Sequence, residues 1–173
     1  MKYSIILLLS FFIASCGSQS PTETIDYKTN IKAQAQSMGQ LLLKKDFKGF
    51  AKYTLPKVME IVGGEEAMIQ MMESSSSEME AGGTKFLNVT YGEPSAIITN
   101  GKELQCTLPQ TTEIQVAEGI MVSQSTLIAV SIDNGKSWQF MDTSGQDLQT
   151  LKKSVPTLSD ALVIPPTPEP VMK

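Results

Sequence analysis

The hydrophobic residues of this 173-residue chain follow two different periods, first that of a helix and then that of a strand. Up to Gly83 the apolar positions recur at intervals of three and four residues, which predicts amphipathic helices. The first helix is long, and its apolar stripe consists of Tyr27, Ile31, Ala35, Met38 and Leu42. Three more helices are predicted to begin at Asp46, Pro56 and Glu65. Aspartate caps a helix, proline suits its first turn, and negative charge complements its N-terminus.

After Gly83 apolar and polar residues alternate, which predicts the strands of an antiparallel meander. The predicted strands cover residues 85–91, 96–99, 104–116, 120–132 and 136–142. Pro109 lies inside the longest of them, and we expect a bulge there because proline cannot donate a hydrogen bond to the ladder. A short helix around Leu148 and Leu151 follows, and the prolines beyond Ile164 favour an extended tail without helix or sheet.

Strand parity predicts which side chains face the helices. The predicted inner face consists of Leu104, Cys106, Leu108, Ile114, Val116, Val122, Ile128, Val130, Ile132, Trp138 and Phe140. A pocket between helices and sheet would have a polar lining made of Gln110, Thr112, Gln124, Thr126 and Asp142.

Helices followed by a meander indicate an α+β fold with N-terminal helices packed on one face of a curved antiparallel sheet. This order resembles the NTF2-like (cystatin-like) superfamily over residues 24–143, and residues 46–53 look like that family's second helix. The resemblance implies a conical pocket between the long helix and the bent sheet. A helix-on-meander domain without a pocket is the alternative. We predict a single domain over residues 25–160 and a proline-rich C-terminal tail over residues 161–173.

The N-terminus has the pattern of an export signal. Lys2 precedes an apolar run over residues 5–13, which is too short to span a bilayer because a spanning helix needs about 20 apolar residues. The following Ala14-Ser15-Cys16 resembles the lipobox of bacterial lipoproteins, which implies a diacylglycerol on the thiol of Cys16. Residues 1–15 would then be a cleaved signal peptide and residues 16–24 a tether. The protein would be lipid-anchored in the cell envelope, and the membrane would be the outer one if the cell is Gram-negative; the pattern does not indicate whether the periplasmic or the surface face carries it.

Composition excludes several classes of chemistry. All 14 basic residues are lysines, and the chain contains neither arginine nor histidine. The absence of histidine excludes a histidine-dependent catalytic triad and a metal bound through imidazole, and no cofactor is predicted. A net charge of −4 without arginine also argues against nucleic acid as a partner. Cys106 alternates with Leu104 and Leu108 and has no histidine to activate it, so a buried apolar role is predicted.

Residues 131–138 match the Asp-box pattern S-x-D-x-G-x-x-W, known from sialidases and other propellers. We interpret the motif as a self-contained turn and not as a catalytic site, since a propeller needs many more strands. Asp133 can accept hydrogen bonds from the turn backbone, Gly135 supplies a positive φ, and Trp138 packs beneath the turn.

The methionines favour either a plain core or an adaptable groove for an apolar ligand or peptide. These methionines are Met59, Met68, Met71, Met72, Met79 and Met121.

Two functions remain open at this stage. The first is non-catalytic binding of a small apolar ligand or an envelope protein. The second, which the resemblance to NTF2-like enzymes implies, is a cofactor-independent isomerase, cyclase or dehydratase with Asp142 as base and Tyr53 or Tyr91 as proton donor. The second requires Asp142 to be shielded from solvent. An exposed Asp142 that caps the next turn would favour the first.

Overall fold

The computed structural model describes residues 26–173. Its helices are α1 (Tyr27–Leu43), α2 (Phe47–Ala51), α3 (Pro56–Ile61), α4 (Glu65–Ala81) and α5 (Leu148–Ser154). Its strands are β1 (Lys85–Tyr91), β2 (Ile98–Asn100), β3 (Glu103–Val116), β4 (Gly119–Ser131), β5 (Gln139–Asp142) and β6 (Val171–Met172). The predicted α+β class is therefore confirmed. The predicted signal peptide, Cys16 and the predicted tether lie outside the described residues.

Local capping explains where several helices begin. The side chains of Asp26, Asp46 and Asp147 accept hydrogen bonds from backbone N–H groups of the first turns of α1, α2 and α5. Pro56 occupies the first turn of α3, where its missing N–H needs no partner. The sequence signals for α2 and α3 are thus confirmed.

The strands form one antiparallel sheet in which β1, β3, β4 and β5 are neighbours in that order, with β2 also paired to β3 and β6 to β4. The β3–β4 hairpin is continuous from the pair Val116–Gly119 to the pair Leu104–Ser131. The bulge expected at Pro109 is wrong, because Pro109 pairs with Thr126 without a shift in register. The backbone of Pro109 faces Gly92, whose N–H donates to the Pro109 carbonyl oxygen. Because β1 ends one residue earlier, at Tyr91, the missing N–H of Pro109 interrupts no β1–β3 hydrogen bond.

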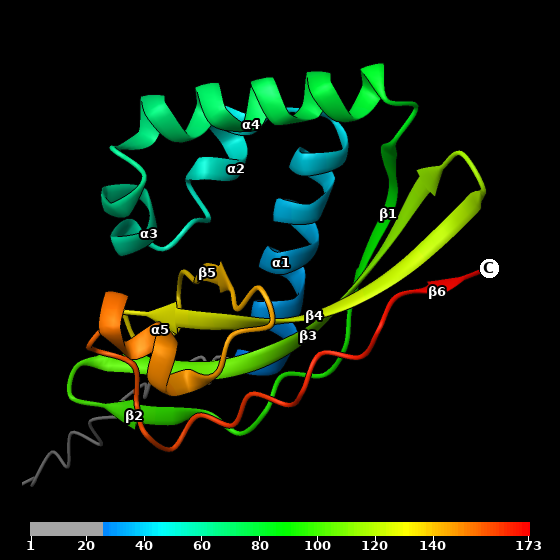
Figure 1. The fold of residues 1–173 in the computed structure, drawn as a ribbon. Coiled ribbons are helices and arrows are strands. Elements are labelled where there is room, and N and C mark those ends of the chain that lie inside the picture. The colour runs from blue at the N-terminus through cyan, green and yellow to red at the C-terminus, as the bar shows by residue number, and fades with distance from the viewer. Residues whose placement is uncertain (1–25) are drawn as a thin grey trace, which may run out of the picture.

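Two apolar layers cover the two faces of the sheet (Figure 1). On one face α1 packs Ile31, Ala35 and Met38 against Cys106, Leu108, Leu127, Ala129, Trp138 and Phe140. On the other face α5 and the chain after it pack Leu151, Val155, Leu158 and Leu162 against Ile128, Val130 and Met141. The prediction that the helices occupy one face is therefore correct for α1 and wrong for α5, and Leu55 and Val58 of the α3 region also pack against the α5-face cluster.

The predicted inner parity is correct for β3 and β5 but wrong for β4. Cys106 pairs with Ala129, which places Leu127 and Ala129 on the α1 face. Ile128 and Val130 lie on the α5 face, and Ile132 is 71% exposed. Residues 126–131 are buried whichever way they point, so apolar alternation could not identify the inner face.

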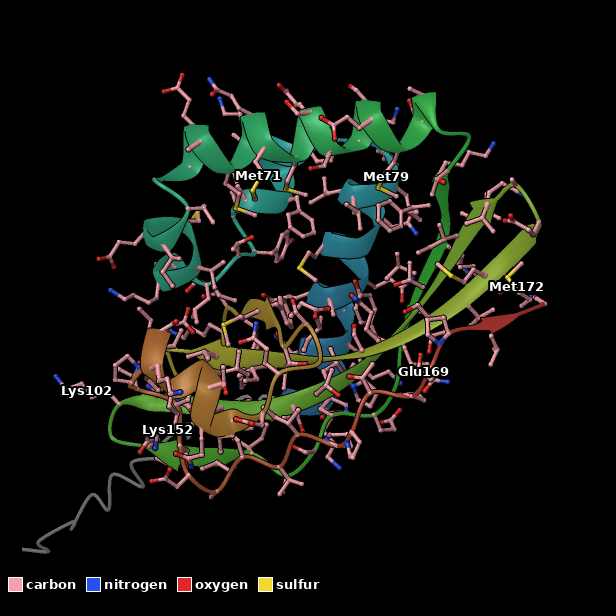
Figure 2. All side chains as sticks on the ribbon, viewed as in Figure 1. Met71, Met79, Lys102, Lys152, Glu169 and Met172 are labelled. Carbon is pink, nitrogen blue, oxygen red and sulfur yellow. The ribbon has the colours of Figure 1, made fainter. Side chains whose placement is uncertain are left out.

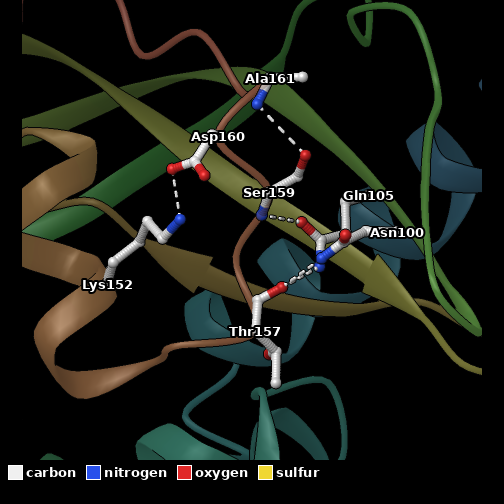
Figure 3. A network of polar contacts seen from close by, with 7 residues as sticks. All are labelled: Asn100, Gln105, Lys152, Thr157, Ser159, Asp160 and Ala161. Atoms are coloured by element: carbon white, nitrogen blue, oxygen red, sulfur yellow. Dashed lines mark hydrogen bonds and ion pairs between the residues drawn. The ribbon is translucent and has the colours of Figure 1, made fainter.

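A polar network fastens the chain after α5 to the sheet (Figure 3). The fully buried Gln105 donates through Nε2 to the Thr157 carbonyl oxygen at 2.9 Å and accepts from the Ser159 N–H at 2.9 Å. Asn100 donates to the same Thr157 oxygen at 2.8 Å, and Lys152 pairs with Asp160. This network satisfies the one buried amide side chain of β3 and positions Leu158 and Leu162 over the sheet.

The end of the chain also pairs with the sheet. Val171 and Met172 pair with Val122 and Met121, and the N–H of Lys173 donates to the Ile120 carbonyl oxygen at 2.8 Å. The expected tail without sheet is therefore wrong for residues 171–172. The last proline of the tail is Pro170, so residues 171–173 all have N–H groups that can pair.

Candidate functional site

A cavity of about 510 Å³ opens between α1, the short helices and the outer half of the β3–β4 hairpin. Its apolar wall consists of Met38, Leu42, Phe50, Val58, Met68, Phe86, Tyr91, Ile114, Leu127, Phe140 and Met141. Its polar lining consists of Thr54, Gln110, Thr112, Ser123, Ser125, Asp142 and Ser144. We call this space the central cavity. Its size lies within the usual range of small-molecule sites, about 300–1,000 Å³.

Three of the other polar lining residues gather around Asp142, and we call this group the polar end of the central cavity. The Ser125 hydroxyl donates to Asp142 Oδ2 at 2.8 Å, and the N–H of Ser144 donates to Oδ1 at 2.6 Å. Gln110 Nε2 donates to Ser125 Oγ at 3.1 Å and lies 3.4 Å from Asp142 Oδ2. The cross-strand pair Gln110–Ser125 and the end of β5 next to β4 bring these residues together.

Tyr91 lines the same cavity and is half-buried. Burial raises the pKa of its hydroxyl above the ordinary value, and the nearby negative charge of Asp142 raises it further. The ring lies against α1 at Gly39, where a Cβ would come within 2.8 Å of Tyr91 Oη. Gly39 therefore allows the helix to approach the tyrosine closely.

Asp142 is exposed, and its carboxylate caps the following turn through Ser144. This is the arrangement that favours a binding protein over a proton-transfer enzyme, because the enzyme hypothesis required an Asp142 shielded from solvent. Tyr53, the other proposed donor, packs against the core around Trp138 and does not line the cavity. Tyr91 and Asp142 do share the cavity, as the enzyme hypothesis also required.

The predicted polar lining is correct for Gln110, Thr112 and Asp142 and wrong for the two β4 residues. Thr126 is buried on the opposite face and Gln124 is exposed there, while Ser123 and Ser125 line the cavity. The error follows from the misjudged parity of β4.

Three methionines of α4 line a second space, which we call the α4 groove. It measures about 380 Å³ and lies beneath α4, beside the end of α1 and the start of β1. Its apolar wall consists of Leu42, Leu43, Phe47, Met71, Met72, Met79 and Phe86, and its polar rim of Lys45, Ser75, Ser76, Glu80, Thr84 and Lys85. Met68 lines the central cavity instead, while Met59 and Met121 line neither space.

The Asp-box segment is a structural turn, as predicted. Asp133 accepts from the N–H groups of Lys136 and Ser137 at 3.1 and 2.9 Å and from the Ser137 hydroxyl at 2.6 Å. Gly135 has a φ of +80°, and Trp138 Nε1 donates to its carbonyl oxygen at 3.2 Å. These bonds hold the indole in the α1 core, where its exposed fraction is 1%.

Cys106 is buried in the same core, and burial raises the pKa of its thiol to about 12. A protonated, inaccessible thiol fits the predicted apolar role. Across residues 26–173 no group of three or more acidic, cysteine or histidine side chains is placed to hold a metal ion. No helix in that range is sufficiently long and apolar to cross a membrane.

Comparison of the chain with protein-family models, with curated proteins and with solved structures finds no match.

Proposed function

We propose that this protein binds a small, mainly apolar molecule in the central cavity and does not transform it. The observation that carries the proposal is a cavity of about 510 Å³ with a largely apolar wall and one clustered polar end. Apolar lining with a few convergent polar groups is the common design of ligand sites, in which the apolar wall provides affinity and the polar groups provide orientation.

The polar end indicates the chemistry of the ligand. The Asp142 carboxylate accepts from Ser125 and Ser144, and Tyr91 offers a hydroxyl whose raised pKa keeps it protonated. A ligand hydroxyl could donate to the carboxylate and accept from the tyrosine. We therefore infer a compact apolar ligand with a hydroxyl or similar group at one end.

We also propose that the fold is NTF2-like. A long N-terminal helix packed across one face of an antiparallel sheet, with a cavity between the two, supports this assignment.

A further part of the proposal concerns residues 1–25, which lie outside the described residues, and it depends on the sequence alone. We infer that Cys16 carries a lipid anchor and that the binding domain is displayed in the cell envelope. Acyl chains contribute about 0.8 kcal/mol per buried CH₂, so such an anchor would be stable. Cys16→Ala should move the protein from the membrane fraction to the soluble fraction. A variant that stays in the membrane fraction would contradict the anchor.

The binding proposal is tested with 2-naphthol as probe, by calorimetry on the full-length chain. The matched probe is 2-methylnaphthalene, which keeps the shape and loses the hydroxyl. We expect saturable binding of 2-naphthol and weaker binding of 2-methylnaphthalene, because only the naphthol hydroxyl can form hydrogen bonds with the polar groups around Asp142.

A pair of adjacent substitutions locates the site. Ser123→Phe places a ring inside the central cavity and should weaken 2-naphthol binding by more than about tenfold, or 1.4 kcal/mol. Gln124→Phe introduces the same ring on the opposite face of β4, where residue 124 is exposed, and should leave 2-naphthol binding unchanged. Equal losses in both variants, or no binding to the parent chain, would refute the proposal.

A further inference from the structure

The α4 groove lies outside the central cavity, although Leu42 and Phe86 line both spaces. Figure 2 shows Met71 and Met79 on the side of α4 that faces α1 and α2. The lining residues on α4 run from Met71 to Glu80, so the groove is elongated along about two and a half turns of this helix, and the methionines form its roof.

Helix α4, which forms the roof of the groove, buries few of its side chains. Met68 is the one buried residue among the 17 of α4, and Met71 is 50% exposed although it points toward the groove. Protein interiors are normally close-packed, so a space of about 380 Å³ under an apolar helix face leaves many contacts unmade. Flexible methionine side chains can adapt to an occupant, and dry apolar cavities readily take apolar ligands.

The rim of the groove carries excess positive charge. Lys45 pairs with Glu80, whereas Lys85 forms no ion pair within the part of the chain that the structure describes. The hydroxyl groups of Ser76 and Thr84 also lie on this rim. An acidic head group beside Lys85 would compensate its charge and accept a hydrogen bond from the hydroxyl of the adjacent Thr84.

We propose that the α4 groove binds a fatty acid, with the acyl chain against the methionines and the carboxylate at Lys85. The site is separate from the one proposed for the central cavity, and neither proposal depends on the other. A single acyl chain fits an elongated apolar space, and one carboxylate matches the one uncompensated lysine of the rim.

The first test compares dodecanoate with dodecanol as competitors for a fluorescent acyl probe on the full-length chain. Dodecanoate should bind more tightly than dodecanol by about two- to fivefold, the range expected for an exposed ion pair. Lys85→Gln should remove this preference and leave dodecanol binding unchanged. Equal binding of acid and alcohol to the parent chain would refute the role of the carboxylate.

The second test locates the acyl chain with two neighbouring serines of α4. Ser76 lines the groove and Ser77 does not, so Ser76→Trp should weaken dodecanoate binding and Ser77→Trp should leave it unchanged. Ser123→Phe, which fills the central cavity, should also leave it unchanged. Loss of binding in Ser77→Trp or Ser123→Phe, or no binding to the parent chain, would overturn the proposal. Circular dichroism verifies folding, and Lys85→Gln tests the site even if Ser76→Trp does not fold.

Discussion

The two halves of the sheet face beneath α1 are built from the same strands but are filled differently. In the half near Trp138, Cys106 and Leu108 of β3 meet Leu127 and Ala129 of β4, and all four are buried in the core beneath α1. In the other half, the same face of the same hairpin lines the central cavity with Gln110, Thr112, Ser123 and Ser125. We call these the packed half and the hollow half.

The change in residue type along each strand explains the difference. β3 changes from leucine and cysteine to glutamine and threonine at residue 110, and β4 makes the matching change from serine to leucine and alanine at residue 127. Small polar side chains on both strands of a hairpin cannot fill the space under a helix. The packed half therefore provides stability, and the hollow half contains the cavity in which we propose that a ligand binds.

The largest expected effect is the loss of the packed half's central side chain. Trp138→Ala should lower the free energy of unfolding by about 3–5 kcal/mol, because a fully buried aromatic leaves a cavity that the core cannot close. The control is Glu113→Ala on the other face of β3, which removes only an exposed ion pair with Lys173 and should cost about 0–1 kcal/mol. Urea unfolding measures both. Similar losses would mean that the packed half does not dominate stability.

Two glycines, one beside each half of the sheet face, test how rigid their surroundings are. Gly135 lies in the turn next to Trp138, and Gly39 lies in α1 next to Tyr91. A Cβ at Gly135 would lie 2.3 Å from Tyr27 Cε1, on a ring that packs edge-on against Trp138, and φ at Gly135 is +80°. Gly135→Ala should therefore cost about 2 kcal/mol.

Gly39→Ala meets the end of Tyr91, which borders the hollow half and can move into it. Because alanine also favours the helix by about 1 kcal/mol, this change should be nearly neutral. Thermal unfolding of the two variants decides the matter, and a larger loss for Gly39→Ala would mean that Tyr91 is as tightly held as Tyr27.

Added volume should have opposite effects in the two halves. Ala129→Val enlarges a fully buried residue of the packed half and should cost about 1–3 kcal/mol through overpacking. Ser123→Val adds apolar volume to the hollow half on the same face of β4 and should gain about 0.5–2 kcal/mol. Urea midpoints that shift in the same direction would contradict the contrast between the halves.

Most of the elements, but only part of the site, could be predicted from the sequence. The period of α1 is clear because this helix has one face in the core and one toward solvent. The period of β3 is clear because residues on its α5 face, among them the buried Gln105 and Thr107, are polar and alternate with the apolar residues of its α1 face. Residues 126–131 carry no such signal because both their faces are covered, and the unrecognised α5 layer made Ile128 and Val130 look like residues of the α1 face. The pairs Gln110–Ser125 and Thr112–Ser123 follow from counting outward from the turn at residues 117–118, a signal that alternation alone ignores.

The smallest predicted effect concerns the turn that supports the packed half. Hydrogen bonds, first of all from the Ser137 hydroxyl and then from the Ser137 N–H, lower the pKa of Asp133 from 3.8 to about 2. A carboxyl group whose pKa is lower in the folded than in the unfolded state stabilises the fold above its unfolded pKa, and this contribution is lost as the pH falls toward the folded pKa.

The free energy of unfolding should therefore fall between about pH 4 and pH 2 by a part that Asp133→Asn abolishes. Because Asp133 lies near the surface, we expect a modest contribution, and Ser137→Ala should reduce it by removing the leading donor. Urea unfolding of the parent chain and both variants across this range provides the test. If the parent and Asp133→Asn curves run parallel from pH 4 to pH 2, the Asp133 carboxylate does not stabilise the turn beneath Trp138, and the packed half depends on its apolar contacts alone.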